Sequence, residues 1–299
     1  MNQRLTLPTA LLLTAPPLMW AGNAVVGRLV ADQIPPMTLN FLRWLIAFFI
    51  LLPIAWQILR PASTLWSAWR RYLLLGFLGV GCYNALMYLA LHTSTALNVT
   101  LVGASVPVWM LLIGSLFFRQ PISRMQVLGS VLSIAGVVVV LTRGDLARLE
   151  QIQLVPGDFY MLLASIAWAF YSWILNQPKD PPDIRSNWAA FLMAQMVFGL
   201  SWAGLFASGE WALTHATIGW GWPLAAVLLY VALGPALLAY RCWGMGVQRV
   251  GPATAGFFAN LTPLIAAVLS AAFLSELPQL YHALAFALIV GGIVVSSRR

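Results

Sequence analysis

Ten apolar runs, each about as long as a membrane-spanning helix, follow one another through almost the whole chain. A helix needs about 20 apolar residues to cross the hydrocarbon core of a bilayer. Charged residues, proline clusters and short polar stretches separate the runs. The sequence therefore predicts an all-α integral membrane protein with ten transmembrane helices. We place them at residues 8–30, 37–59, 72–91, 97–118, 124–142, 155–176, 187–207, 220–244, 252–274 and 280–297.

The composition excludes the classes of protein that need a water-facing surface. Of 299 residues, 61% are hydrophobic and only 8% are charged, whereas an ordinary soluble domain has about 25% charged residues. A soluble enzyme, a disordered chain and a secreted disulfide scaffold are therefore excluded. The net charge of +8 does not indicate nucleic-acid binding, because the basic residues stand at the ends of apolar runs. Cys82 and Cys242 lie inside apolar runs, where no disulfide is expected.

The Lys and Arg residues between the runs predict the orientation of the chain. If the N-terminus is cytoplasmic, the cytoplasmic loops and ends hold eleven of them, and the outer loops hold only Arg143 and Arg148. Cytoplasmic loops of membrane proteins carry an excess of Lys and Arg. We therefore expect a multi-pass membrane protein with both termini in the cytoplasm and an outer turn at residues 32–36.

A weak internal repeat divides the chain into two halves. An offset of 156 residues pairs Pro107 with Pro263, and an offset of 148 pairs Trp20 with Trp168. Each half holds five runs, an odd number, so the second half is expected to lie inverted relative to the first. Inverted repeats are typical of alternating-access transporters, which bind their substrates near the membrane midplane. We place the two five-helix domains at residues 1–148 and 149–299.

Several short motifs follow one another along the chain in a definite order. They are Leu18–Asn23, Pro35-Pro36 with Arg43–Ala47, Pro107 and Pro263 in the fourth and ninth runs, and Leu274-Ser275-Glu276 with Gly291-Gly292. Together they resemble the ten-helix EamA-type carriers of the drug/metabolite transporter superfamily, with one departure at Gln120, where those carriers usually have Glu. The resemblance implies a secondary transporter of small metabolites in the bacterial inner membrane. With its 14 tryptophans, the chain is most similar within the superfamily to the bacterial aromatic amino acid exporters.

Two pairs of side chains stand at matching places in the first run of each half. Trp20 and Asn23 are three residues apart, as are Trp168 and Tyr171, so each pair shares one helix face. An indole beside a polar group suits a cavity that holds an aromatic amino acid. Trp109 also lies well inside a run. Helix packing is the alternative for these residues, since a buried Trp needs a hydrogen-bond partner in either case.

Other runs contain further polar and aromatic candidates for substrate binding. Polar side chains inside a membrane usually face the bundle interior or a watery cavity. Asn260 lies near Pro263, and a proline frees a backbone carbonyl that could accept a hydrogen bond from a substrate ammonium. Interhelical hydrogen bonding and a simple kink are the alternatives. The remaining candidates are Tyr83, Asn84 and Tyr88 in the third run and Tyr240 and Trp243 in the eighth.

Few charged residues lie within the runs. Arg43 stands about seven residues into the second run, where it could attract a substrate carboxylate or pair with Asp32. Arg241 lies toward the inner end of the eighth run and is expected to extend to the interface. All eight acidic residues lie in loops or near the ends of runs, so no group that would carry a proton through the membrane is evident.

The sequence favours a secondary carrier over an enzyme or a channel. Metal-binding, phosphate-binding and hydrolytic motifs are missing, and so is a selectivity-filter signature. We expect export of aromatic amino acids by alternating access and gradient-driven uniport. A proton-coupled exporter of drugs or other metabolites is the alternative, and a lipid-modifying membrane enzyme is a more distant one. The expected partners are a small-molecule substrate and membrane lipid, with no cofactor, metal, nucleic acid or obligate protein partner.

Overall fold

The regular structure of the chain is helical throughout the part described. The computed structural model describes residues 5–94, 99, 102–151, 155–265 and 280–298, and it contains no strand within them. The main helices are α1 (Leu7–Leu29), α2 (Pro36–Ala55), α3 (Trp69–Leu75), α4 (Tyr83–Thr93), α6 (Val106–Phe118), α7 (Arg124–Thr142), α8 (Pro156–Asn176), α10 (Trp188–Leu213), α11 (Trp222–Val231), α12 (Ala239–Val250), α13 (Pro252–Phe258) and α15 (Leu280–Ser296). Short helical turns are η1 (Trp56–Leu59), η3 (Leu146–Gln151) and α9 (Pro182–Arg185).

Seven helices among the described residues are long and apolar enough to cross a membrane. They confirm the predicted class, an all-helical membrane protein. The ninth predicted run, 252–274, lies partly outside the described residues, so the count of ten stays a prediction. The seven helices are Leu7–Gly27, Pro36–Leu59, Trp69–Thr93, Arg124–Thr142, Pro156–Asn176, Trp188–Leu213 and Trp222–Val250, and two shorter apolar helices are Val106–Phe118 and Leu280–Ser296.

The fourth and ninth predicted runs are not continuous helices. A turn at residues 104–105 precedes α6, and a turn at residues 259–260 follows α13 before the helix resumes at Leu261. Pro107 therefore stands in the first turn of a helix, as does Pro263. A proline is tolerated there because the first backbone N–H groups of a helix have no partner within it. The two prolines begin helices rather than kinking them.

Two of the long helices contain a π-helical segment that the sequence did not predict. The first, η2 (Gly76–Cys82), joins α3 to α4, and the second, η4 (Ala232–Leu238), joins α11 to α12. Their bounds differ by the same 156 residues as the sequence repeat. Gly76 allows η2 to approach α10, since a Cβ there would stand 2.6 Å from the backbone N of Gly199. Small residues at such contacts let membrane helices pack closely.

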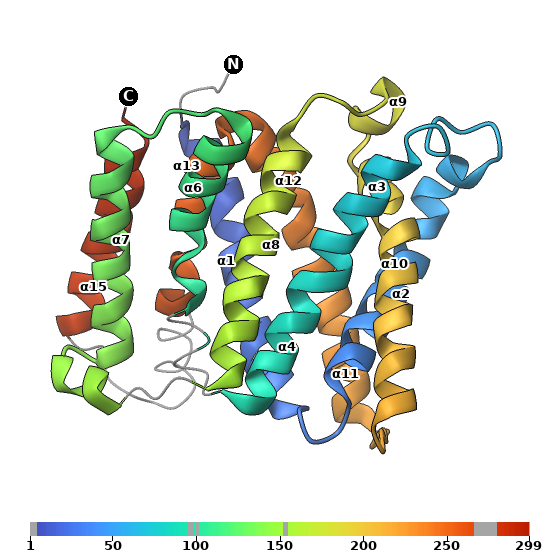
Figure 1. The fold of residues 1–299 in the computed structure, drawn as a ribbon, viewed down its shortest axis with the longest axis horizontal. Coiled ribbons are helices and arrows are strands. Elements are labelled where there is room, and N and C mark those ends of the chain that lie inside the picture. Colours follow the sequence, from blue (N-terminus) through green and yellow to red (C-terminus); the bar gives the residue numbers. More distant parts are fainter. Residues whose placement is uncertain (1–4, 95–98, 100–101, 152–154, 266–279, 299) are drawn as a thin grey trace.

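The helices pack in pairs that join the first half of the chain to the second. Helix α7 packs along α15 at one edge of the bundle, α2 packs on α10, and α6 on α13 (Figure 1). The contacts between α4 and α8 have a counterpart between α12 and α1. This paired pattern is the one expected if two related halves face each other. The core of the molecule is therefore built from both halves together.

One end of the bundle carries the start of α1, the end of α15 and α9 (Figure 1), and we call it the terminal end. Here Asp180 is fully buried and accepts hydrogen bonds from Arg71 at 2.6 Å and Arg185 at 2.7 Å. Tyr72 donates to the same carboxylate at 3.0 Å. We call these four residues the Asp180 clasp. Because the two arginines also donate to the last carbonyls of α8, the clasp ties α3 to the end of that helix.

Candidate substrate site

Arg43 is a fully buried cation inside the bundle. It lies on α2, and its exposed fraction is 0%. Its Nη1 donates to the Oδ1 of Asn84 at 2.6 Å and to the hydroxyl of Tyr88 at 3.1 Å, both on α4. Its Nε and Nη2 have no hydrogen-bond partner among the described residues. One of the three guanidinium nitrogens is thus held by neutral groups, and the other two are unsatisfied.

The hydrogen bonds continue from Arg43 to two further helices. Tyr88 donates to Asn23 on α1 at 2.7 Å. Asn84 donates to the hydroxyl of Tyr240 on α12 at 3.4 Å, and Tyr240 donates to the carbonyl of Gly79 in η2. A π-helical turn leaves carbonyls displaced from the regular pattern, which explains why a side chain reaches this one. We call Asn23, Arg43, Asn84, Tyr88 and Tyr240 the Arg43 network.

None of the ion pairs among the described residues involves Arg43. The pairing with Asp32 that the sequence allowed is not formed, because Asp32 lies in the exposed turn before α2. Burying a charge is costly unless the charge is paired, and such residues inside membrane proteins usually mark a substrate or ion pathway. The guanidinium of Arg43 is therefore a buried cation with unsatisfied N–H donors and no acidic partner among the described residues.

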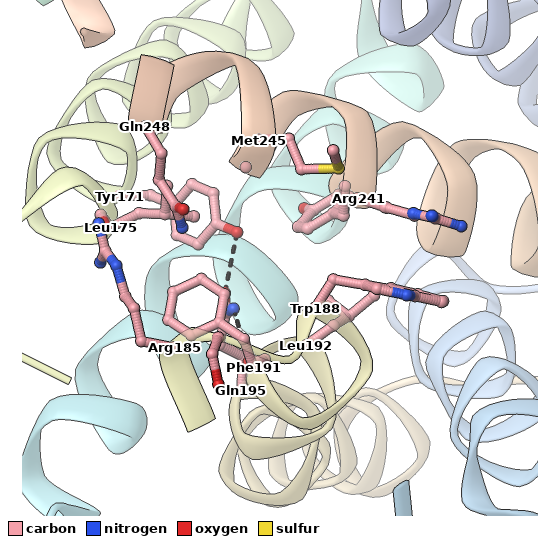
Figure 2. Close-up of a pocket in the computed structure, with 13 residues that line it drawn as sticks. Tyr171, Leu175, Arg185, Trp188, Phe191, Leu192, Gln195, Arg241, Met245 and Gln248 are labelled. Carbon is pink, nitrogen blue, oxygen red and sulfur yellow. Dashed lines mark hydrogen bonds between the residues drawn. The ribbon is translucent and has the colours of Figure 1, made fainter. Parts of the chain in front are cut away.

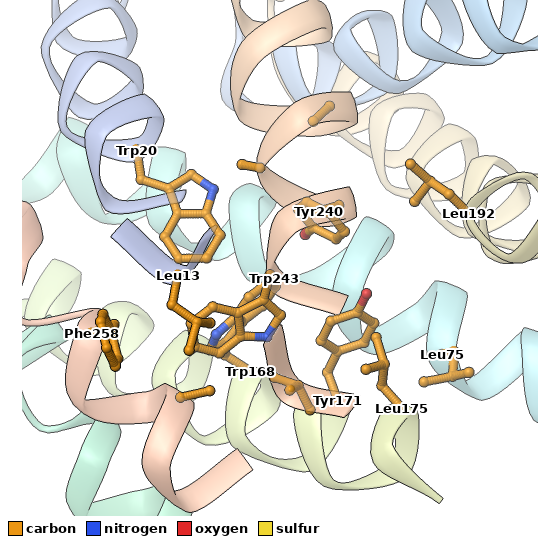
Figure 3. Packing of buried hydrophobic residues seen from close by; sticks show 14 of the residues in the cluster. Leu13, Trp20, Leu75, Trp168, Tyr171, Leu175, Leu192, Tyr240, Trp243 and Phe258 are labelled. Atoms are coloured by element: carbon orange, nitrogen blue, oxygen red, sulfur yellow. The ribbon is translucent and has the colours of Figure 1, made fainter. Parts of the chain in front are cut away.

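Aromatic rings from both halves gather next to this network around Trp168. The ring of Trp168 stands 5.2 Å from that of Trp20, edge to face, and 5.4 Å from that of Trp243 (Figure 3). Such distances and tilts are the favourable ones for aromatic pairs. We call the group the Trp168 cluster, and its members are Trp20, Tyr83, Trp168, Tyr171, Tyr240 and Trp243.

A cavity of about 220 Å³ opens between α8, α10 and α12 near the terminal end. Its base is made by Tyr171, Gln195 and Tyr240, which are all buried. Tyr171 donates to Gln195 at 2.8 Å, the dashed line in Figure 2. The cavity is also lined by Arg185 of α9, which lies at the terminal end (Figure 1), and by Arg241 of α12. A path from this end therefore reaches the edge of the Trp168 cluster.

Tyr240 belongs to the cavity, the Trp168 cluster and the Arg43 network at once. Its ring lines the cavity and stands 5.4 Å from that of Trp168, while its hydroxyl accepts from Asn84. Together with Tyr171, it closes the base of the cavity. Tyr240 therefore links the cavity, which its ring lines, to the Arg43 network, which its hydroxyl joins.

The structure brings ten of the twelve sequence-predicted site residues into the network or the cluster. Trp109 instead donates to Ser105 within its own helix at 3.1 Å. Asn260 donates to Ser133 on α7 at 2.9 Å, so it joins two helices. Arg241 is exposed at the cavity, and its guanidinium lies 4.3 Å from the centre of the Trp188 ring. This agrees with a side chain that extends toward the interface.

Three residues of the site were not among the sequence candidates. Asn40 is buried one turn before Arg43 and donates to the carbonyl of Val80 at 2.9 Å. Trp44 is fully buried, and its ring stands 4.8 Å from that of Tyr240. Gln195 forms part of the cavity base. The rule that polar residues inside membrane helices face the bundle interior would have pointed to Asn40 and Gln195.

Comparison with known proteins identifies the family. The EamA-like transporter family matches residues 7–142 and 155–298. An uncharacterized transporter of Archaeoglobus fulgidus is 23% identical over 97% of this chain and 98% of its own. The uncharacterized inner membrane transporter YedA of Escherichia coli K12 is 25% identical over 93% of this chain and 87% of its own.

Two further comparisons agree with this match. The uncharacterized transporter YyaM of Bacillus subtilis is 22% identical, with 76% of this chain and 72% of YyaM covered. A crystal structure with 21% sequence identity superposes on the chain with a TM-score of 0.72 and covers 96% of both chains, which shows a shared fold. The family match extends over nearly the whole chain, and the protein therefore belongs to the EamA-like transporter family, as a multi-pass membrane transporter.

Proposed function

We propose that the protein exports small amphipathic metabolites that carry an aromatic ring and a carboxylate, with aromatic amino acids as the first class to test. The observation that carries the proposal is Arg43, a buried cation with no acidic partner among the described residues. Arg binds carboxylates through charge-assisted, often bidentate hydrogen bonds. The adjacent Trp168 cluster offers ring faces and edges to an aromatic side chain.

In alternating access, the substrate would occupy the cavity first and the Arg43 network second. A substrate enters the cavity at the terminal end, meets Tyr171 and Tyr240, and displaces Tyr240 to bring its carboxylate to Arg43. The two halves then rock about the site and open it toward the opposite end. The pairing of helices across the halves and the matched π-helical segments support two repeats, at residues 1–148 and 149–299, that move against each other.

The transport is driven by the substrate gradient rather than by protons. Asp180 is held by two arginines, and Glu210 caps the start of α2 through the N–H groups of Met37 and Thr38. Asp158 bonds Ser94 and the N–H of Val155 at the start of α8. These acids hold helix ends together and lie outside the Arg43 network. A proton-coupled exporter is the alternative, and accumulation under an imposed pH gradient alone would favour it.

Uptake into proteoliposomes tests the proposed function. The purified protein should carry labelled tryptophan, phenylalanine and tyrosine faster than protein-free vesicles do, and an aliphatic amino acid such as alanine should enter more slowly. Equal and low uptake of all four compounds would refute an aromatic substrate class. Liposomes that contain the Arg148→Gln variant serve as a matched control, since Arg148 is exposed and lies far from the site in the η3 turn.

Cysteine labelling tests the proposed orientation, in which the terminal end faces the cytoplasm. Thr64 lies in an exposed loop between η1 and α3, where its hydroxyl donates to Asp183 of α9. A Thr64→Cys variant that lacks Cys82 and Cys242 should not react with an impermeant reagent in intact cells. An Asp32→Cys variant in the same background should react. The reverse pattern would overturn the orientation.

A further inference from the structure

The polar atoms that the site leaves unsatisfied are mostly donors. Four buried donors of the site have no partner among the described residues: Nε and Nη2 of Arg43, Nδ2 of Asn23 and Nε1 of Trp44. On the same helices, only one buried acceptor, Oδ1 of Asn40, is left free. Outside the site, Nε1 of Trp202 and Oδ1 of Asn260 are also unpartnered among the described residues. Buried polar groups are normally satisfied by protein, water or ligand. The missing groups are thus mainly acceptors.

These unsatisfied atoms belong to one neighbourhood. Asn40, Arg43 and Trp44 lie within about one turn of α2, and the guanidinium carbon of Arg43 stands 5.3 Å from the centre of the Trp44 ring. Asn23 is joined to Arg43 through the hydroxyl of Tyr88. A single small group with two acceptor oxygens would accept hydrogen bonds from several of these donors at once. A carboxylate has this shape and also supplies the missing negative charge.

The site offers much less to an ammonium group. No described acidic residue bonds any member of the Arg43 network. The acceptors nearest to it are neutral: the free oxygen of Asn40 and the backbone carbonyls of η2, of which Val80 and Gly79 already accept bonds from Asn40 and Tyr240. A buried ammonium would therefore add a second cation near Arg43 without an anion of its own among the described residues.

We propose that the site selects its substrates by charge and prefers aromatic monocarboxylate anions that lack an α-ammonium group over the zwitterionic aromatic amino acids. This inference rests on the proposed function and narrows its substrate class. The charge of Arg43 is matched by one carboxylate, so the occupied site is neutral with an anion. With a zwitterion it retains a positive charge that must be buried when the site closes, and buried charge is costly.

A second consequence concerns the driving force. Arg43 stays with the protein, so each exported monoanion carries one negative charge across the membrane. The cytoplasm of a living cell is electrically negative, and the membrane potential therefore drives such an anion outward. A zwitterion carries no net charge and gains nothing from the potential. Export of aromatic acids would thus be energised without a proton and without nucleotide hydrolysis.

Three compounds that share a phenyl ring and a two-carbon linker distinguish the effect of the carboxylate from that of the ammonium group. Hydrocinnamate has the carboxylate alone, phenylalanine has both charged groups, and phenethylamine has the ammonium alone. In proteoliposomes at neutral pH, hydrocinnamate should inhibit uptake of labelled phenylalanine at a concentration at least about tenfold below that needed with unlabelled phenylalanine, a free-energy difference of about 1.4 kcal/mol. Phenethylamine should not inhibit. Inhibition by phenylalanine at the same or a lower concentration than hydrocinnamate would overturn the inference.

An imposed membrane potential tests how much net charge crosses the membrane with each substrate molecule. With valinomycin and a tenfold potassium gradient that makes the vesicle interior positive, labelled hydrocinnamate should accumulate toward about tenfold, the equilibrium for a monovalent anion. Protein-free vesicles measure passive entry of the acid. Phenylalanine should equilibrate without accumulation. Hydrocinnamate uptake that does not change with the membrane potential would contradict the inference. In that case, phenylalanine uptake above the protein-free level would still support the proposed function. If neither compound enters faster than in protein-free vesicles, the proposed function itself fails.

An acidic side chain introduced next to Arg43 should remove the preference for the anion over the zwitterion. Asn84 already accepts from Arg43 at 2.6 Å, so Asn84→Asp places a carboxylate of the same shape against the guanidinium. This variant should lose its preference for hydrocinnamate over phenylalanine by at least about tenfold, and it should still reach the membrane. The Arg43→Lys variant, which retains a cation, should keep the preference. An Asn84→Asp variant with the parental preference would overturn the assignment of Arg43 as the charge selector.

Discussion

Two groups of arginines in the described part of the chain, the partly buried pair Arg71 and Arg185 and the fully buried Arg43, have opposite surroundings. In the Asp180 clasp, Arg71 and Arg185 share one buried carboxylate and also cap the end of α8. In the Arg43 network, the guanidinium contacts an amide and a phenol, and no ion pair among the described residues includes it. The clasp is complete without a ligand, and the Arg43 network is not.

The difference separates structural charge from functional charge. A buried ion pair that loses one partner leaves the other charge unpaired, which is strongly destabilising. A buried cation such as Arg43, which has no acidic partner among the described residues, already carries that cost in the folded protein. Removal of the cation should therefore spare stability and affect whatever the cation binds. The following variants test this contrast, in order of decreasing effect.

Asp180→Asn should have the largest effect, on stability. It leaves two partly buried arginines facing a neutral amide, and breaking a buried pair in this way costs about 3–5 kcal/mol. The exposed fractions of Arg71 and Arg185 are 12% and 22%, so solvent should reduce the loss toward the lower end of that range. The measurement is the unfolding temperature in detergent. An unchanged unfolding temperature would show that the clasp is not a stabilising element.

Arg43→Gln should have the next largest effect, on transport. Hydrogen bonds to charged groups contribute about 1.5–3 kcal/mol, which corresponds to a loss of about tenfold to more than a hundredfold in transport of aromatic carboxylates. The unfolding temperature should stay the same or rise, because an unpaired buried charge is removed. A variant that unfolds earlier yet transports at the parental rate would reverse the roles given to the two groups of arginines.

Trp168→Ala and Trp20→Ala should each have a smaller effect, confined to aromatic substrates. Loss of one aromatic contact costs about 0.5–1.5 kcal/mol beyond the burial of area, a decrease of about twofold to tenfold. The amount of protein in the membrane serves as the control. Parental transport in both variants would mean that the Trp168 cluster only packs helices, the alternative that the sequence left open.

The sequence predicted the candidate site better than its surroundings. Trp20 and Trp168 were chosen because they occupy matching places in the two halves, and their rings are in contact. Asn84 and Tyr240 match at an offset of 156 residues, and they share a hydrogen bond. Residues at equivalent places in related halves tend to meet where the halves face each other. This is why a comparison within one chain could locate them.

Other features could not be inferred from a linear pattern. Asp180 follows a polar stretch, and the sequence predicts only that it lies in a loop or near the end of a run. In the structure its side chain is buried between two arginines. The π-helical segments η2 and η4 have the same apolar composition as the helices around them. Their positions depend on packing between distant helices, such as η2 against α10. Such contacts carry no periodic signal in the sequence.

Ligand-dependent unfolding tests the role of Arg43 most directly. A ligand that binds only the folded state raises its stability by RT ln(1 + [L]/Kd), about 2.7 kcal/mol at a hundredfold excess over Kd. Saturating hydrocinnamate or phenylalanine should therefore raise the unfolding temperature of the purified protein, and phenethylamine should not. The Arg43→Gln variant should lose the shift and Arg148→Gln should keep it. A full shift in Arg43→Gln would contradict the claim that Arg43 binds the substrate carboxylate.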